Sequence, residues 1–238
     1  MKKIPSFLAL SYFLLAASNE DIIKFYESTL KLQYPSAKVS VLKRDKVAKT
    51  GFESVELGIE IDGQKQKEIL FTKDDLIVPD IIDIKEKISY RNEYEMAEFM
   101  QSKLEFENKA LKALKDEKQI IKIGDSKKPL VYVFTDPECP YCRQHLKNIK
   151  EELKNNQIAF IITPVHPKSA FEKAALIYKE AANAKTDAQK IAIFEKYYDE
   201  NIKNYDKVSD KELKAMYALF DKYKNLGLRS VPTIIEAK

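Results

Sequence analysis

The residues best suited to chemistry are Cys139 and Cys142, the only cysteines in the 238-residue chain. They enclose Pro140 and Tyr141, and the motif directly follows an apolar, strand-like run and begins a helical stretch. Two thiols at this spacing can form and break a disulfide with each other. The sequence therefore predicts a redox-active cysteine pair with the motif CPYC.

The predicted helix start gives the two cysteines different roles. Pro140 suits the first helical position, because its missing N–H would have no partner there, so Cys139 is expected at the N-cap. The unpaired N–H groups and partial positive charge of the helix end stabilise a thiolate, which makes Cys139 the expected nucleophile. Cys142 is expected to be the more buried, resolving thiol, which attacks a mixed disulfide on Cys139 and releases the substrate.

Three alternative roles for the cysteine pair fit the sequence less well. A structural zinc site with His145 and His166 has a spacing that fits no common finger. A purely structural disulfide would close so short a loop that it would stabilise little. A cytosolic glutaredoxin-like protein would leave the N-terminal half of the chain without a role. Each histidine alone is interpreted as a surface or satisfied polar residue. No metal or cofactor is expected beyond the redox-active disulfide Cys139–Cys142.

Composition sets the broad class of protein. Apolar residues make up 45% of the chain, with 13 Tyr and 12 Phe, which is unlike the composition of disordered chains. The formal charge is only +4, and lysines alternate with acidic residues along the whole chain. This pattern predicts solvated surfaces and not a phosphate-binding stripe, so nucleic acid is not an expected partner.

The first 18 residues have the order of a secretory signal peptide. Lys2 and Lys3 precede an apolar run from Ile4 to Ala17, which ends in small residues. A buried N-terminal helix is the alternative interpretation. A secretory signal would direct the mature chain to an oxidising compartment, where disulfide chemistry has a use. The expected location is therefore the periplasm.

The N-terminal half predicts a helix packed on a small antiparallel sheet. Helical spacing covers residues 20–34 and ends at Pro35. Alternating strands at 54–61 and 64–72 are joined by Asp62-Gly63, and a short strand follows at 76–78. Residues 92–115 then predict a long amphipathic helix, either a connecting rod or a packed core helix, whose apolar positions are Ala97, Met100, Leu104, Leu111 and Leu114.

The C-terminal half predicts strands separated by helices. Strands are expected at residues 119–123, 130–134, 158–162 and 233–235, and helices at 142–155, 170–184, 188–198 and 210–224. The run at 130–134 is continuously apolar, which suits a strand buried on both faces of a sheet. The part from 130 to 162 is therefore expected to form a βαβ unit.

The stretch from Val133 to Cys142, VFTDPECPYC, resembles the active-site strand and helix of the DsbC/DsbG disulfide isomerases. The resemblance implies an α+β protein in four parts. These are a signal peptide (residues 1–18), a cystatin-like dimerisation domain (19–90), a linker helix (91–117) and a thioredoxin-like catalytic domain with a helical insertion (118–238). It also implies a homodimer formed through residues 19–90.

A second resemblance lies near the C-terminus, where Val231-Pro232-Thr233 is similar to the cis-proline loop of that family. It implies that Val231, Pro232, Pro140 and Tyr141 contact the substrate. The family usually has Thr where this chain has Val231, and Val at this position is more similar to the DsbA oxidases. The family also continues with another strand and helix, so the end at Lys238 leads us to expect a truncated gene product.

The expected function is disulfide exchange with exported proteins that carry cysteines or mispaired disulfides, supported by a membrane redox partner. Whether the chain acts as an isomerase or as an oxidase stays open at this point. The alternative is a periplasmic holdase, whose dimer cleft binds unfolded chains and in which the cysteines are secondary.

Overall fold

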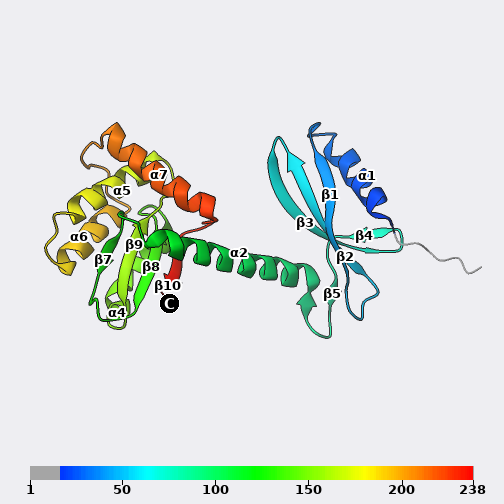
Figure 1. Ribbon diagram of the computed structural model, residues 1–238, viewed down its shortest axis with the longest axis horizontal. Helices are drawn as coiled ribbons and strands as arrows, with labels where there is room; N and C mark the ends of the chain where they lie inside the picture. Colours follow the sequence, from blue (N-terminus) through cyan, green and yellow to red (C-terminus); the bar gives the residue numbers. More distant parts are fainter. Residues whose placement is uncertain (1–16, 238) are drawn as a thin grey trace, which may run out of the picture. The chain divides into compact units, whose positions relative to one another are not determined.

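The computed structural model describes residues 17–237, which form two compact units that divide between Phe99 and Met100 (Figure 1). The predicted signal peptide lies outside the described residues, apart from Ala17 and Ser18. Within residues 17–237, no helix combines the length and the apolar character needed to cross a bilayer.

The main part of the first unit is one helix packed on a four-stranded antiparallel sheet. The sheet has the order β1-β2-β3-β4. The elements are α1 (Asn19–Leu30), β1 (Lys38–Lys46), β2 (Glu53–Ile61), β3 (Gln64–Lys73) and β4 (Leu76–Val78). The predicted hairpin and its turn at Asp62-Gly63 are confirmed. Ile22 of α1 is completely buried in a cluster with Val55 and Leu57 of β2, so the predicted packing of a helix on a sheet is also confirmed.

Two details of this unit differ from the sequence prediction. Helix α1 begins with a capping box between Ser18 and Asp21, but it ends at Leu30, before Pro35. Strand β1 was not predicted. Its pairing with β2 shifts register between Val41 and Lys43, and charged residues fill its second half, so no regular alternation of apolar residues marks it.

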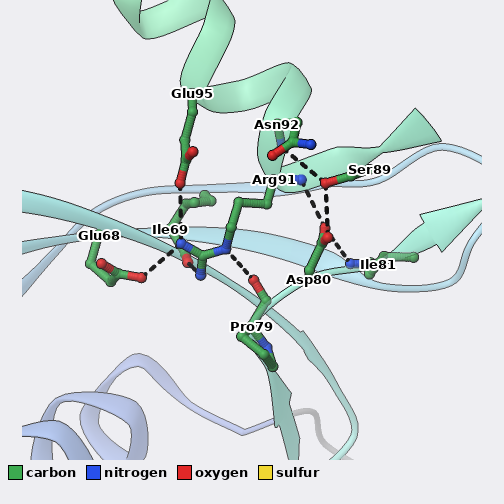
Figure 2. Close-up of polar contacts among 9 residues, drawn as sticks. All are labelled: Glu68, Ile69, Pro79, Asp80, Ile81, Ser89, Arg91, Asn92 and Glu95. Atoms are coloured by element: carbon green, nitrogen blue, oxygen red, sulfur yellow. Dashed lines mark hydrogen bonds and ion pairs between the residues drawn. The ribbon is translucent and has the colours of Figure 1, made fainter.

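The long helix α2 (Tyr90–Leu114) begins after a small hairpin of β5 (Ile82–Asp83) and β6 (Ile88–Ser89). Figure 2 shows how its first turn is held within the first unit. The Arg91 guanidinium donates hydrogen bonds to the carbonyl oxygens of Pro79 (2.6 Å) and Ile69 (2.5 Å), and it pairs with Glu68 at 3.0 Å. The start of α2 is thereby tied to strand β3 and to the end of strand β4.

A second set of bonds holds the same turn from the other side (Figure 2). The carboxylate of Asp80 accepts hydrogen bonds from the backbone N–H groups of Ile81 and Arg91 and from the Ser89 hydroxyl, at 2.7, 3.0 and 2.8 Å. The Ser89 hydroxyl accepts from the backbone N–H of Asn92 at 3.1 Å. Three donors thus converge on the Asp80 carboxylate at the N-terminal end of α2, where a negative charge is favourable.

The bounds of α2 confirm the predicted long helix, but its predicted apolar face is wrong in part. Met100 and Leu104 are about half exposed, whereas Phe106, Ala110 and Leu114 are buried. Only the apolar side chains in the last turns of α2 are therefore buried, and they pack in the core of the second unit.

Among the described residues, the second unit contains a four-stranded mixed sheet, the C-terminal part of α2 and five further helices. The strand order of the sheet is β10-β8-β9-β7, with β8 and β9 parallel and both edge strands antiparallel. The strands are β7 (Ile121–Ile123), β8 (Leu130–Thr135), β9 (Gln157–Ile162) and β10 (Thr233–Glu236). The helices are α3 (Pro140–Lys147), α4 (Ile149–Glu152), α5 (Lys168–Ala181), α6 (Asp187–Tyr198) and α7 (Asp210–Leu226). The predicted βαβ unit is confirmed, although its helix is divided at Asn148.

Aromatic rings show how both faces of this sheet are covered. Phe134 of β8 packs edge-on against Phe106 of α2 and Tyr223 of α7, at centroid distances of 5.4 and 4.7 Å. Phe160 of β9 lies 4.6 Å from Phe194 of α6. Val133 pairs with Phe160 in the sheet, so Phe134 points to the opposite face. The continuous apolar run of β8 is therefore explained by burial on both faces.

Candidate active site

The two cysteines lie where strand β8 passes into helix α3. Cys139 is the N-cap of α3, with an extended backbone (φ −75°, ψ 122°), and Pro140 occupies the first helical turn. No side chain caps this end of the helix. The predicted position of Cys139 at the N-cap is confirmed.

The segment before β10 brings a distant part of the chain to Cys139. Strand β10 pairs with β8, with Thr233 opposite Phe134, and this pairing places Val231 and Pro232 beside the cysteines. The peptide bond between Val231 and Pro232 is cis, as the resemblance implied. The Cys139 thiol donates a hydrogen bond to the carbonyl oxygen of Val231 at 3.4 Å.

The environments of the two thiols differ. Cys139 keeps 5% of its surface exposed and Cys142 keeps none, and both are free thiols in this structure. Burial raises the pKa of the Cys142 thiol to about 12, and the neighbouring Cys139 adds to this, while a hydrogen bond with Thr135 and one with the Asp136 backbone act against it. Cys142 therefore stays protonated at neutral pH unless the environment around it changes.

The other four residues of the predicted site differ in how much of their surface is exposed to solvent. Tyr141 is 77% exposed and Pro140 is exposed as well, so both are open to a partner. Pro232 is half-buried and Val231 is buried. The structure thus gathers all six residues of the predicted site around the start of α3.

A polar pair that was not predicted from the sequence lies next to Cys142. The hydroxyl groups of Thr135 and Tyr198 are hydrogen-bonded at 2.8 Å and are buried. Burial raises the pKa of Tyr198 well above its ordinary value. Thr135 contacts the Cys142 thiol as well, so a chain of three polar side chains runs from Tyr198 of α6 to Cys142. Tyr198 carries no recognisable signal in the sequence, because it lies 63 residues from Thr135.

A buried carboxylate holds the loop before Cys139. Asp136 is completely buried, and one of its oxygens accepts a hydrogen bond from the backbone N–H of Glu138 at 2.7 Å. The other oxygen accepts from the backbone N–H groups of Val165 (2.7 Å) and His166 (3.1 Å) and lies 2.8 Å from His166 Nδ1. The active-site loop is thereby joined to the loop that leads from β9 to α5.

The two histidines of the alternative zinc site have other partners. His166 pairs with Asp136, and His145 Nε2 lies 3.0 Å from the carboxylate of Glu152. Among residues 17–237, no group of three or more His, Cys, Asp and Glu side chains is arranged to hold a metal ion.

A buried ion pair completes the surroundings of the motif. The ammonium group of Lys173, in α5, lies 2.9 Å from a carboxylate oxygen of Glu138, the residue before Cys139. The aromatic ring of Tyr205 is 6.0 Å from the same ammonium group. Neither member of this pair was predicted, since the two residues are distant in sequence and lysines are frequent throughout the chain.

Comparison with known proteins agrees with the fold. DsbG of Helicobacter pylori has a similar structure, with 21% sequence identity, a TM-score of 0.52, and coverage of 89% of this chain and 98% of that one. A disulfide interchange protein of Neisseria gonorrhoeae is 21% identical, with a TM-score of 0.37 over 49% of this chain and 78% of its own. ScsC of Proteus mirabilis in a compact conformation is 18% identical, with a TM-score of 0.36 over 61% and 86%.

The sequence comparison locates the shared part. No curated protein matches the chain significantly. A family described as thioredoxin-like domain matches residues 116–237, which is about half of the chain and contains the whole cysteine site. The α+β fold and the resemblance to DsbG-type proteins are thus confirmed. The chain belongs to the thioredoxin-like family.

Proposed function

We propose that the protein is a periplasmic thiol–disulfide oxidoreductase that exchanges disulfides with exported proteins through Cys139 and Cys142. The observation that carries the proposal is the asymmetry of the pair. Cys139 lies at the N-terminal end of a helix, beside the Val231 carbonyl, and Cys142 is fully buried behind it. A helix end favours a thiolate, and the thiolate is the reactive form in disulfide exchange.

As an oxidase, the protein starts with a Cys139–Cys142 disulfide. A substrate thiolate attacks the sulfur of Cys139, so that a mixed disulfide forms and Cys142 leaves with the electron pair of the broken bond and takes up a proton. A second substrate thiolate then attacks the substrate sulfur of the mixed disulfide. The substrate gains its disulfide, and both cysteines of the protein end reduced.

As an isomerase, the protein starts with both cysteines reduced. The Cys139 thiolate attacks a mispaired substrate disulfide and releases one substrate thiolate. If another substrate thiolate attacks the mixed disulfide, the substrate is rearranged and Cys139 is regenerated. If Cys142 attacks instead, the substrate is reduced and the protein becomes oxidised. The relative rates of these two attacks decide whether the substrate is rearranged or reduced.

Substrate contacts come from residues around the pair. Tyr141 and Pro140 offer exposed surface between the cysteines, and the Val231-Pro232 segment lies beside Cys139. An extended substrate segment next to this loop would present its own cysteine to the sulfur of Cys139. A membrane redox partner would restore the oxidised or reduced state after each cycle.

The remaining parts of the proposal concern assembly and location. A homodimer formed through residues 19–90 would present two catalytic units to one substrate. Export by the N-terminal segment would bring the chain to the periplasm, where disulfides persist.

A holdase is the second candidate, and exposed apolar side chains on α2 favour it. Met96, Met100 and Leu104 follow one another at four-residue steps, so they share one face of the helix, and each is about half exposed or more. Such a stripe can bind apolar segments of unfolded chains. In this case the cysteines would be secondary.

The test is oxidation and isomerisation of a reduced or scrambled disulfide protein by residues 19–238, compared with Cys139→Ala and Cys142→Ala. We expect Cys139→Ala to lose both activities and Cys142→Ala to accumulate a mixed disulfide on Cys139. Suppression of aggregation is measured in parallel. If Cys139→Ala keeps all measurable activity, the oxidoreductase proposal is wrong and the holdase is favoured.

A further inference from the structure

Lys173 is the only lysine that is buried among residues 17–237. Its ammonium group lies 2.9 Å from a carboxylate oxygen of Glu138, whose side chain is itself mostly buried. Burying two charges costs free energy that their attraction does not reliably offset, so such a pair is weak evidence of a stabilising role. A role in the chemistry of the neighbouring cysteine accounts for the position of this pair better.

Glu138 directly precedes Cys139, and this position has an electrostatic consequence. Neighbouring Cα atoms are about 3.8 Å apart, so the Glu138 carboxylate can lie no farther from the sulfur of Cys139 than this distance plus the lengths of the two side chains. In the protein interior, interactions between charges are only weakly screened. A lone carboxylate at this position would repel a thiolate on Cys139 and so disfavour the reactive form.

The other charged groups near this end of α5 already have partners. Glu172 pairs with Lys168 at 3.2 Å and accepts a hydrogen bond from the Tyr205 hydroxyl at 3.3 Å. Asp136 is bound by His166 and by three backbone N–H groups. Lys173 is thus the cation in direct contact with the Glu138 carboxylate.

We propose that Lys173 is a positioning residue for the redox reaction, which neutralises Glu138 and thereby sets the redox equilibrium of the Cys139–Cys142 pair. A charge on Cys139 exists only in the reduced protein, because a disulfide is neutral. The field of the ion pair consequently changes the free energy of the reduced form and leaves the oxidised form nearly unaffected. The inference rests on the proposed oxidoreductase function.

The proposal gives opposite signs to single and double substitutions. Lys173→Met leaves Glu138 as an uncompensated negative charge beside Cys139, so the equilibrium constant for reduction of the disulfide by glutathione should fall about tenfold. For a two-electron couple this corresponds to about 30 mV. The double variant Glu138→Gln/Lys173→Met removes both charges and should return to within about threefold of the wild type. A merely structural role predicts that the double variant is as impaired as the single one or more so.

Two further variants separate charge from packing. Lys168→Met removes an exposed lysine from the same helix and should leave the equilibrium constant unchanged. Lys173→Gln keeps a hydrogen-bond donor for Glu138 but no charge, and it should give the same direction of change as Lys173→Met. It replaces Lys173→Met if that variant does not fold.

The experiment equilibrates residues 19–238 with glutathione buffers and measures the oxidised fraction by thiol labelling. The rate of Cys139 alkylation is also followed from pH 4 to 9, and its pH dependence should move to higher pH in Lys173→Met and return in the double variant. If the wild type equilibrates but Lys173→Met and Lys173→Gln stay within twofold of it, Lys173 has no such role. If the wild type itself forms no disulfide with these buffers, the proposed oxidoreductase function fails as well.

Discussion

The sulfur of Cys139 lies 3.4 Å from the carbonyl oxygen of Val231, a residue 92 positions later in the chain. The contact exists because β10 pairs with β8, the strand that ends just before the cysteines. The carbonyl oxygen accepts a hydrogen bond from a thiol, but a thiolate has no proton to donate to it. Val231 thus contacts the reactive sulfur in a way that depends on the protonation state of Cys139.

Replacing Val231 by Thr should stabilise the reduced protein, which is the form that attacks mispaired disulfides. A hydroxyl at this position can donate a hydrogen bond to the Cys139 thiolate, and such a bond to a charged group stabilises the reduced form. We expect the equilibrium constant for reduction by glutathione to rise about three- to tenfold. At a given ratio of reduced to oxidised glutathione, a larger fraction of the protein should then be reduced, and isomerisation of a scrambled substrate should be faster.

The matched controls are Val231→Ser, which offers the hydroxyl without the methyl group, and Val231→Ala, which offers neither. Val231→Ser should follow Val231→Thr, and Val231→Ala should not. An equal rise in Val231→Ala would assign the effect to lost packing.

The two thiols should differ in reactivity in the reduced, folded protein. Burial raises the pKa of Cys142 to about 12, so almost none of it is thiolate at neutral pH. Iodoacetamide at pH 7 should therefore modify Cys139, and Cys142 only after unfolding. Mass spectrometry of proteolytic fragments measures both sites, and comparable labelling of Cys142 in the native state would contradict the structure.

Tyr198→Phe should lower stability and alter the resolving step. The substitution removes one hydroxyl from a buried hydrogen bond with Thr135 while keeping the ring in the core. The loss should be about 1 kcal/mol in the free energy of unfolding, measured by urea denaturation. Tyr141→Phe, at an exposed position, is the control and should leave the free energy of unfolding unchanged.

The same variant is informative about catalysis. Thr135 contacts Cys142. Without the Tyr198 hydroxyl, the hydroxyl group of Thr135 is free to reorient toward the Cys142 thiol. Reduction of a mixed disulfide by Cys142 should change in rate by about threefold or more, while the first attack by Cys139 stays constant. Unchanged rates for both steps would show that the polar chain only packs the core.

Asp80→Asn should weaken the start of α2 in a pH-dependent way. Burial opposes ionisation of Asp80, but hydrogen bonds from Arg91, Ser89 and Ile81 outweigh it and lower its pKa below the ordinary 3.8. A lowered pKa stabilises the folded state above the unfolded pKa, and this contribution is lost as the pH falls through the folded value. The variant should be less stable than the wild type by about 1 kcal/mol at pH 7.

The difference should shrink as the pH falls through this lowered pKa, since the wild-type carboxyl then becomes protonated too. Urea denaturation at pH 7 and pH 2.5 measures it. The exposed Asp75→Asn serves as the control with no expected effect at either pH. A difference that is equal at both pH values would contradict the role of the charge.

The parts of the fold with local signals could be predicted from the sequence. The hairpin around Asp62-Gly63 has a turn motif between alternating strands, and Pro140 marks the start of a helix at Cys139. Phe106 and Ala110 are buried, whereas Met100 and Leu104 are about half exposed. The sequence could not predict this difference, because both pairs are apolar and both have the four-residue spacing of a helix face. Which turns of a long helix are covered depends on distant elements.

A site residue could be predicted from the sequence only if its side chain has a distinctive chemistry or if it belongs to a motif of a known family. The cysteines are identified by their spacing, whereas the position of Val231 beside Cys139 came from the family resemblance and not from any local pattern. Thr135 with Tyr198 and Glu138 with Lys173 were not predicted. Lys173 lies in α5 and Tyr198 lies in α6. The sequence of neither helix indicates which of its side chains will face the active-site strand.

The complete burial of Cys142 beside Cys139 has a consequence for oxidative damage. A peroxide that reaches Cys139 converts its thiolate to a sulfenic acid, which a neighbouring thiol condenses to a disulfide with release of water. Cys142 is that neighbour, and its lack of exposure keeps it from being consumed by the same oxidant. The reduced protein should thus end in its own catalytic disulfide under peroxide stress, where Cys142→Ala would accumulate sulfinic and sulfonic acids at Cys139.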